Sequence, residues 1–308
     1  MFAILVSLLL VVLVNAQRPK PCGENKVTLA IYSGLHDPVW KFDSRHESFK
    51  AIKEHLDDAR AKGITYRHEQ MPSIIGFRGF LVQPIDAEQA DLIVGQETVA
   101  LQKLLLDTMP EGLIRDDLRK KILQAIDSGA VSAKIPDRTQ STTPQDVSRV
   151  VGKILHYAPP LNLARWNTNC VQPYNNCYNY ANDKITNSFA QPGKASGKPI
   201  TELTVAQVLA AVESDGWLKM DVPPEAPCPA APEQPNCLVA LFVAVGTDFH
   251  CMRLDNNTLW SQKLGSAPAT NKDGAGKVIT DPRKAVNLPY SPDYKFVSFM
   301  KIFTNIIE

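Results

Sequence analysis

A continuous apolar run, CLVALFVAV at residues 237–245, constrains the fold more than any other feature of the chain. Six prolines lie just before it, within residues 221–236, and mark a loop. An apolar run bounded in this way predicts a buried β-strand. Residues 248–254 and 259–263 predict two further strands, and the turn between them indicates a hairpin. We therefore expect an antiparallel sheet in the second half of the chain.

Helical patterns precede these strands. Apolar spacing predicts helices at residues 177–187 and 205–213, and a final strand is expected at residues 295–303. Helices followed by antiparallel strands indicate an α+β fold. We place this second domain at residues 166–308.

The first half shows the mixed pattern of a small N-terminal α+β domain, at residues 17–130. A capping box at Ser44-Arg45-His46-Glu47 predicts the start of a helix that ends at Gly63. Gly129 predicts the C-cap of another helix. The other expected elements are strands at residues 26–32, 77–83 and 91–95 and helices at residues 99–106 and 114–126.

A linker is expected at residues 131–165, between the two domains. Ser, Thr and Pro are frequent in residues 136–146, which favours an exposed connection. Residues 147–157 predict a short helix.

The chain opens with an apolar segment that predicts a cleavable signal peptide at residues 1–16. The small residues of Val14-Asn15-Ala16 suit signal peptidase. The apolar core is too short for a transmembrane helix, which needs about 20 residues. The alternative, an N-terminal anchor, is disfavoured because a polar segment follows. We therefore expect a secreted protein that has no membrane association after cleavage.

Composition limits the function classes. The remaining chain of about 290 residues is long enough for one large or two ordinary domains. With 44% hydrophobic and 21% charged residues it is globular. Its net charge of +1 argues against a nucleic-acid partner and against a polyacidic mineral-nucleating protein.

Six cysteines in an exported chain permit three disulfides, with fifteen possible pairings. Cys170 lies close to Cys177, and Cys228 and Cys237 could close the proline-rich loop, so both pairs are candidate disulfides. A free Cys177 is the alternative. The sequon Asn256-Asn257-Thr258 makes Asn256 a possible glycosylation site.

One constellation of residues suits nucleophilic catalysis. Cys177 opens a predicted helix, where unpaired amides would lower its pKa toward neutrality. His250 lies on a predicted strand of the following sheet. A thiol at a helix start beside an imidazole on a sheet is the arrangement of papain-like cysteine catalysis. A hydrogen-bonded sheet residue is the plain alternative for His250.

Gln262 is the candidate group that orients the imidazole. Its role depends on the register of the hairpin. If Leu254 pairs with Leu259, His250 faces Lys263 and Gln262 points to the other face of the sheet. If the loop is one residue shorter, His250 faces Gln262.

No metal or cofactor site is expected. The other histidines have no metal-ligand spacing, and the aspartates form no calcium-loop pattern. Trp217 and Trp260 are expected to pack in the core or on the sheet rather than to stack on carbohydrate.

Two segments around these residues carry a family resemblance. Residues 175–195, NNCYNYANDKITNSFAQPGKA, and residues 248–273, beginning DFHCMRL, resemble paired motifs of a family of secreted proteins, and DPR at residues 281–283 also fits. That pattern is similar to papain-like or NlpC/P60-like cysteine peptidase cores. The resemblance implies Cys177 as nucleophile and His250 as base. The family usually has an aromatic residue where this chain has Cys251, and His where it has Gln262.

The whole chain also resembles insoluble shell matrix proteins of bivalves, with IYSGLHDPVW at residues 31–40 and GFRGFLVQ at residues 76–83 in the first domain. This resemblance implies a framework component of the organic matrix of a calcified shell. The implied partners are other matrix proteins or polysaccharides. The alternatives are an active cysteine amidase or peptidase and a glycan-binding module without catalysis.

Overall fold

The computed structural model describes residues 25–84, 87–134, 158–230, 237–302 and 307–308. Two antiparallel sheets with flanking helices form the described part of the chain, which confirms an α+β fold. The first sheet has the strand order β2-β1-β3-β4 and the second the order β5-β10-β6-β7-β8-β9. The predicted signal peptide and most of the predicted linker, with its helix at residues 147–157, lie outside the described residues.

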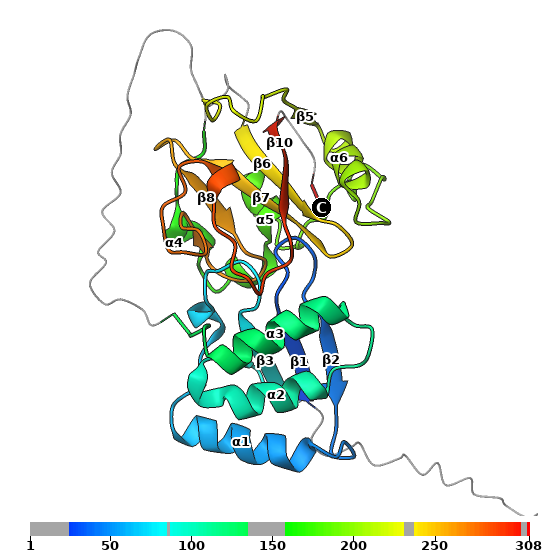
Figure 1. Ribbon diagram of the computed structural model, residues 1–308, viewed down its shortest axis with the longest axis vertical. Helices are drawn as coiled ribbons and strands as arrows, with labels where there is room; N and C mark the ends of the chain where they lie inside the picture. The colour runs from blue at the N-terminus through cyan, green and yellow to red at the C-terminus, as the bar shows by residue number, and fades with distance from the viewer. Residues whose placement is uncertain (1–24, 85–86, 135–157, 231–236, 303–306) are drawn as a thin grey trace, which may run out of the picture.

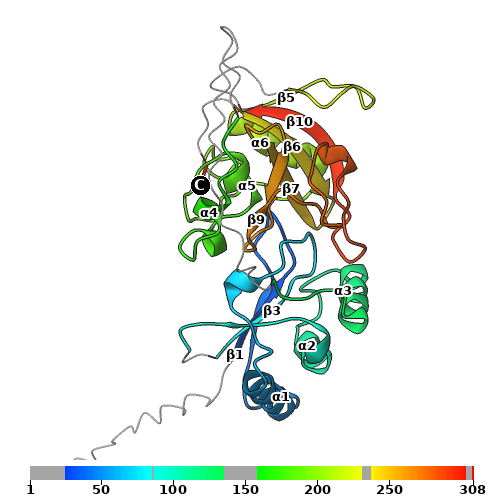
Figure 2. The same ribbon diagram turned by 90° about the vertical axis from the view of Figure 1, so that its left-hand side faces the viewer.

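The first sheet comes from the first half of the chain. Its helices α2 and α3 lie over one face, and α1 lies beside α2 (Figures 1 and 2). The strands are β1 (Asn25–Ala30), β2 (Val39–Phe42), β3 (Gly79–Pro84) and β4 (Asp91–Ile93). The helices are α1 (Phe49–Ala61), α2 (Val99–Asp107) and α3 (Asp116–Ser128), with short 3-10 turns η1 (His68–Gln70) and η2 (Gln96–Thr98).

One helix end was predicted correctly and one was not. Gly129 caps α3 in the left-handed conformation, at φ 59°, as expected. The capping box at Ser44 is wrong, because α1 begins only at Phe49 after Ser48. Asp43 accepts hydrogen bonds from the backbone and side chain of Arg45, so this segment forms a separate turn before the helix.

The second sheet is built around β6 (Cys237–Ala244), as predicted. All eight of its residues are buried, and it lies between β7 and β10. The other strands of this sheet are β5 (Trp217–Lys219), β7 (Asp248–Leu254), β8 (Trp260–Lys263), β9 (Ala269–Thr270) and β10 (Lys295–Ile302). The strand β10, near the end of the described chain, lies between β5 and β6.

The helices of the second half are short, and α5 packs against β7 and β8. They are α4 (Leu163–Trp166), α5 (Cys177–Ala181) and α6 (Val205–Ser214), with 3-10 turns η3 (Gln172–Tyr174) and η4 (Pro282–Lys284). The expected helix over residues 177–187 is therefore too long. Asp183, Asn187 and Phe189 have positive φ, which a right-handed helix does not permit.

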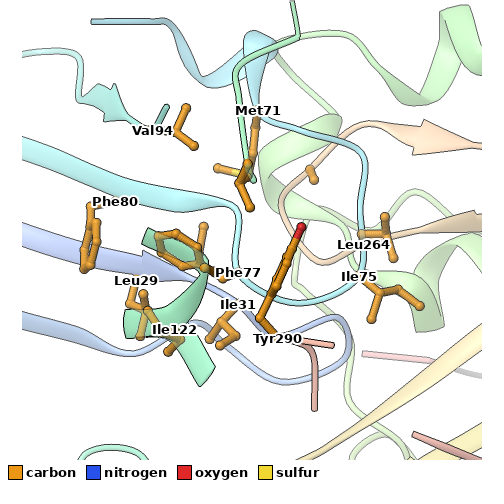
Figure 3. Close-up of a cluster of buried hydrophobic side chains, with 14 of the residues drawn as sticks. Leu29, Ile31, Met71, Ile75, Phe77, Phe80, Val94, Ile122, Leu264 and Tyr290 are labelled. Carbon is orange, nitrogen blue, oxygen red and sulfur yellow. The ribbon is translucent and has the colours of Figure 1, made fainter. Parts of the chain in front are cut away.

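One hydrophobic core joins the two halves. Even-numbered residues of β6, such as Leu238 and Ala240, belong to the same buried cluster as the first sheet. Figure 3 shows part of this cluster, where Ile31 and Phe77 lie near Tyr290 from the second half. Odd-numbered residues of β6 pack on the other face, in a cluster with residues of α5 and α6. Among the described helices, none is long and apolar enough to cross a bilayer.

Candidate functional site

Cys177 is the first residue of α5, and its position is fixed by an asparagine capping box. The Asn176 side-chain oxygen accepts hydrogen bonds from the amides of Tyr178 (3.0 Å) and Asn179 (3.1 Å). The Asn179 side-chain oxygen accepts one from the Asn176 amide at 3.2 Å. This reciprocal pair satisfies amides that a helix start leaves without partners. It holds the thiol at the junction of α5 and the second sheet.

His250 lies on β7, and Gln262 on β8 orients its imidazole. His250 Nε2 and Gln262 Oε1 are 2.8 Å apart. The Gln262 amide nitrogen donates to the Lys272 carbonyl oxygen at 2.8 Å, so its oxygen must face the histidine. Because that oxygen can only accept, Nε2 carries the proton and Nδ1 is the basic nitrogen. Nδ1 is buried and has no hydrogen-bond partner among the described residues.

The hairpin register differs from both predicted alternatives. Leu254 pairs with Trp260, and Met252 pairs with Gln262, so the loop is one residue longer than in the first alternative. Because side chains alternate, this register keeps Gln262 on the face of His250, as a diagonal neighbour. Gln262 therefore reaches the imidazole by a route that the sequence analysis did not consider.

Lys263 takes no part in the histidine contact. Its ammonium group donates to the carbonyl oxygens of Gln172 (2.6 Å), Gly265 (2.6 Å) and Ala267 (3.1 Å). Burial lowers its pKa well below the ordinary value. It ties the segment after β8 to the turn before α5.

The Cys177 thiol lies near His250, but its pKa is raised rather than lowered. Burial raises the pKa of Cys177 well above the ordinary value, and contact with the Cys251 thiol raises it further. The contact with His250 acts in the opposite direction and is the smaller effect. The expected fall toward neutrality is therefore wrong, because desolvation by burial is the largest effect on this thiol.

The site is closed to solvent. Cys177 and His250 are 0% exposed and Gln262 is 1% exposed. The covering segment is the β1–β2 loop of the first half, at residues 31–37. The Ser33 carbonyl oxygen accepts a hydrogen bond from the Cys177 amide (3.4 Å). The Cys177 side chain therefore has no exposed surface through which a substrate could reach its thiol.

Asp248 is a site residue that the sequence analysis missed. Its carboxylate accepts hydrogen bonds from the amides of Ser33 (2.6 Å) and Leu35 (2.8 Å) and from the Tyr294 hydroxyl (2.5 Å). Burial raises its pKa to about 6, although these hydrogen bonds lower it. Its place at the start of β7, directly before Phe249 and His250, was the only sequence signal for it.

The cysteines that the structure describes are all free thiols. The candidate disulfides Cys170–Cys177 and Cys228–Cys237 are therefore not formed. Cys170 is exposed whereas Cys177 is fully buried, which places the two side chains in different environments. The nucleophile candidate thus keeps its thiol.

The remaining predicted features have clear positions. Trp217 and Trp260 are buried, so neither can stack on a saccharide. Asn256 is exposed in the β7–β8 turn. Within the described ranges, no group of His, Cys, Asp and Glu side chains could hold a metal ion.

Comparison with known proteins identifies the class. The chain belongs to the family of insoluble shell matrix proteins. A relative is insoluble matrix shell protein 1 of Ruditapes philippinarum, 44% identical over 126 residues that make up 41% of this chain and 80% of the relative. No protein-family model matches the chain, and no solved structure matches it. The likeness to papain-like or NlpC/P60-like cores therefore has no support from a related fold.

Proposed function

We propose that the protein is a secreted structural component of the organic matrix of a calcified shell. The observation that carries this proposal is its membership of a family whose relative is named as an insoluble matrix shell protein. The net charge of +1 suits a framework protein better than a mineral-binding polyanion. Its partners are other matrix proteins or polysaccharides.

The buried site agrees with a structural role. Cys177 and His250 have no exposed surface, and burial keeps the thiol protonated at neutral pH. A protonated, enclosed thiol is a poor nucleophile. The core shared between the two halves makes the described chain a suitable rigid building unit.

Proteomics of shell tests this function. Cleaned shell is dissolved in acid, and the insoluble and soluble fractions are digested and analysed by mass spectrometry. Peptides of this chain are expected in the acid-insoluble residue. Their absence there, together with abundance in the soluble secretion, would reject the structural role.

A cysteine amidase or peptidase is the second candidate function. It is supported by the resemblance, which implies Cys177 as nucleophile and His250 as base, and by the hydrogen bond between His250 and Gln262. His250 Nδ1 would take the thiol proton, and the thiolate would attack the carbonyl carbon of an amide. The departing amine would receive that proton, and water would hydrolyse the resulting thioester. Gln262 would keep the proton on Nε2 throughout.

Turnover of a peptide mixture tests this second function. The wild-type chain is compared with Cys177→Ala, and with Cys170→Ala as the matched control at an exposed cysteine. A hydrolase loses turnover with Cys177→Ala and keeps it with Cys170→Ala. Equal release of new amino termini from all three proteins would reject catalysis by this site.

A further inference from the structure

We propose that the β1–β2 loop, residues 31–37, is a built-in peptide ligand that occupies a peptide-binding site beside Cys177. The site belongs to the second half of the chain, and the loop belongs to the first half. The proposal goes beyond the matrix function, since it assigns a ligand class to the closed site. It concerns binding and does not require Cys177 to be catalytic.

The main chain of the loop is bound at successive peptide groups. The Ser33 carbonyl oxygen accepts hydrogen bonds from the amides of Cys177 (3.4 Å) and Gly265 (3.1 Å). The next carbonyl oxygen, of Gly34, accepts from the side chains of Asn176 (2.7 Å) and Gln191 (2.9 Å). These four donors come from three segments of the second half, since Asn176 and Cys177 are adjacent, and they converge on two neighbouring carbonyl groups.

The loop amides are bound on their other side by one carboxylate. Asp248 accepts hydrogen bonds from the amides of Ser33 (2.6 Å), Gly34 (3.2 Å) and Leu35 (2.8 Å). Recognition of both carbonyl and amide groups does not depend on side-chain identity. The site therefore suits a peptide main chain as its ligand class.

The space around the loop selects small residues. A Cβ atom added to Gly34 would lie 2.6 Å from the Phe249 ring and 2.6 Å from the Phe249 carbonyl oxygen. Ser33 is fully buried. A Ser-Gly step is therefore the part of the ligand that enters the site, and a side chain at the position of Gly34 would clash with Phe249 of β7.

The first half holds the loop in this shape. The Asp37 carboxylate accepts hydrogen bonds from the amides of Ile31 (2.8 Å) and Tyr32 (2.7 Å). The guanidinium of the buried Arg78 donates to the Tyr32 carbonyl oxygen at 2.9 Å. Figure 1 shows the loop extending from the first sheet toward the second. A preformed loop loses little conformational entropy on binding, so it competes well against free peptides.

Gly34→Ala tests the proposal in the full chain. The added methyl group should displace the loop from β7 and raise the rate at which iodoacetamide labels Cys177 by about tenfold or more. Gly112→Ala is the control, since a Cβ atom added to Gly112 meets nothing within 4 Å, so this variant adds a methyl group at a positive-φ glycine without a steric clash. Its labelling rate should equal that of the wild type. Gln191→Ala, which removes one bond to Gly34, is the milder second variant if Gly34→Ala does not fold.

A synthetic peptide identifies the ligand class. The peptide IYSGLHD, which has the sequence of residues 31–37, should slow labelling of Cys177 in Gly34→Ala, and a scrambled peptide should not. Rapid labelling of Cys177 in the folded wild type would overturn the proposal. So would labelling of both loop variants at the wild-type rate, or no protection by the peptide. A chain that binds the peptide but turns over no substrate would support the proposal while rejecting the hydrolase function.

Discussion

The Ser33 carbonyl oxygen accepts a hydrogen bond from the Cys177 amide at 3.4 Å, which joins the β1–β2 loop to the first turn of α5. The contact links residues from opposite halves of the chain. The loop thereby helps to bury Cys177, the candidate nucleophile, which is 0% exposed. The two halves are thus joined both by a shared hydrophobic core and by a polar contact at this site.

Asp248→Asn is expected to change how stability depends on pH. Burial raises the Asp248 pKa from 3.8 to about 6, so the folded state binds a proton more tightly than the unfolded chain does. Between these pH values the wild-type free energy of unfolding should fall as pH rises, by roughly 3 kcal/mol from this group. Asparagine does not titrate, so the variant should lack this fall.

Urea denaturation at pH 4, 5, 6 and 7 measures this effect for both proteins. The difference between the two curves isolates Asp248 from the other carboxylates. Its contribution is greatest at low pH and lost as pH rises toward 6, which is the reverse of a salt-bridged carboxylate. Parallel curves for wild type and variant would show that the carboxylate has an ordinary pKa.

Gln262→Leu should destabilise the fold by about 1–3 kcal/mol, because it leaves the buried N–H of His250 without an acceptor. The double variant Gln262→Leu with His250→Phe removes both polar groups. Its free energy of unfolding should recover part of the loss, since no buried imidazole donor remains. Chemical denaturation of the two single variants and the double variant measures this coupling. Strictly additive losses would mean that the 2.8 Å contact contributes nothing.

The strands of the second sheet could be predicted because their pattern is local. The run at β6 and the alternation at β7 identified both strands from sequence alone. The end of α5 could not be predicted, since it depends on positive φ at Asp183 and Asn187. The hairpin register could not be predicted either, because the sequence does not fix the length of the turn, and the observed register is neither of the two alternatives.

Part of the environment of the candidate residues could be predicted. Gln262 was expected beside His250 and does bond its imidazole, while the catalytic role of Cys177, His250 and Gln262 stays a prediction. Ser33 and Asp248 were missed because their hydrogen bond spans a sequence separation of 215 residues. The direction of the Cys177 pKa shift was wrong for the same reason. Burial by a distant loop leaves no signal near the thiol.

Thiol reactivity should follow burial across the described cysteines. Cys170 is exposed and should react rapidly with iodoacetamide at pH 8 in the folded protein. Cys228 is half-buried, and burial raises its pKa to about 11, so only about one thiol in a thousand would be ionised. Cys177 and Cys251 should remain unlabelled.

Peptide mapping by mass spectrometry after timed labelling measures this order. Labelling in guanidinium chloride is the control, in which all of these cysteines should react at similar rates. A disulfide between Cys170 and Cys177 would appear as a linked peptide pair and would contradict the structure.

Asn256 is expected to carry an N-linked glycan when the protein is made in a secretory pathway. Asn256, Asn257 and Thr258 are all exposed in the β7–β8 turn, so the sequon is open to the transferase. Thr258 adopts a left-handed backbone conformation in this turn, at φ 65°. Digestion with an amidase that removes N-linked glycans should increase electrophoretic mobility, and Thr258→Ser should preserve the shift. Asn256→Gln should abolish it. Because the turn lies outside the Cys177 site, iodoacetamide labelling of Cys177 should not differ between the glycosylated chain and Asn256→Gln.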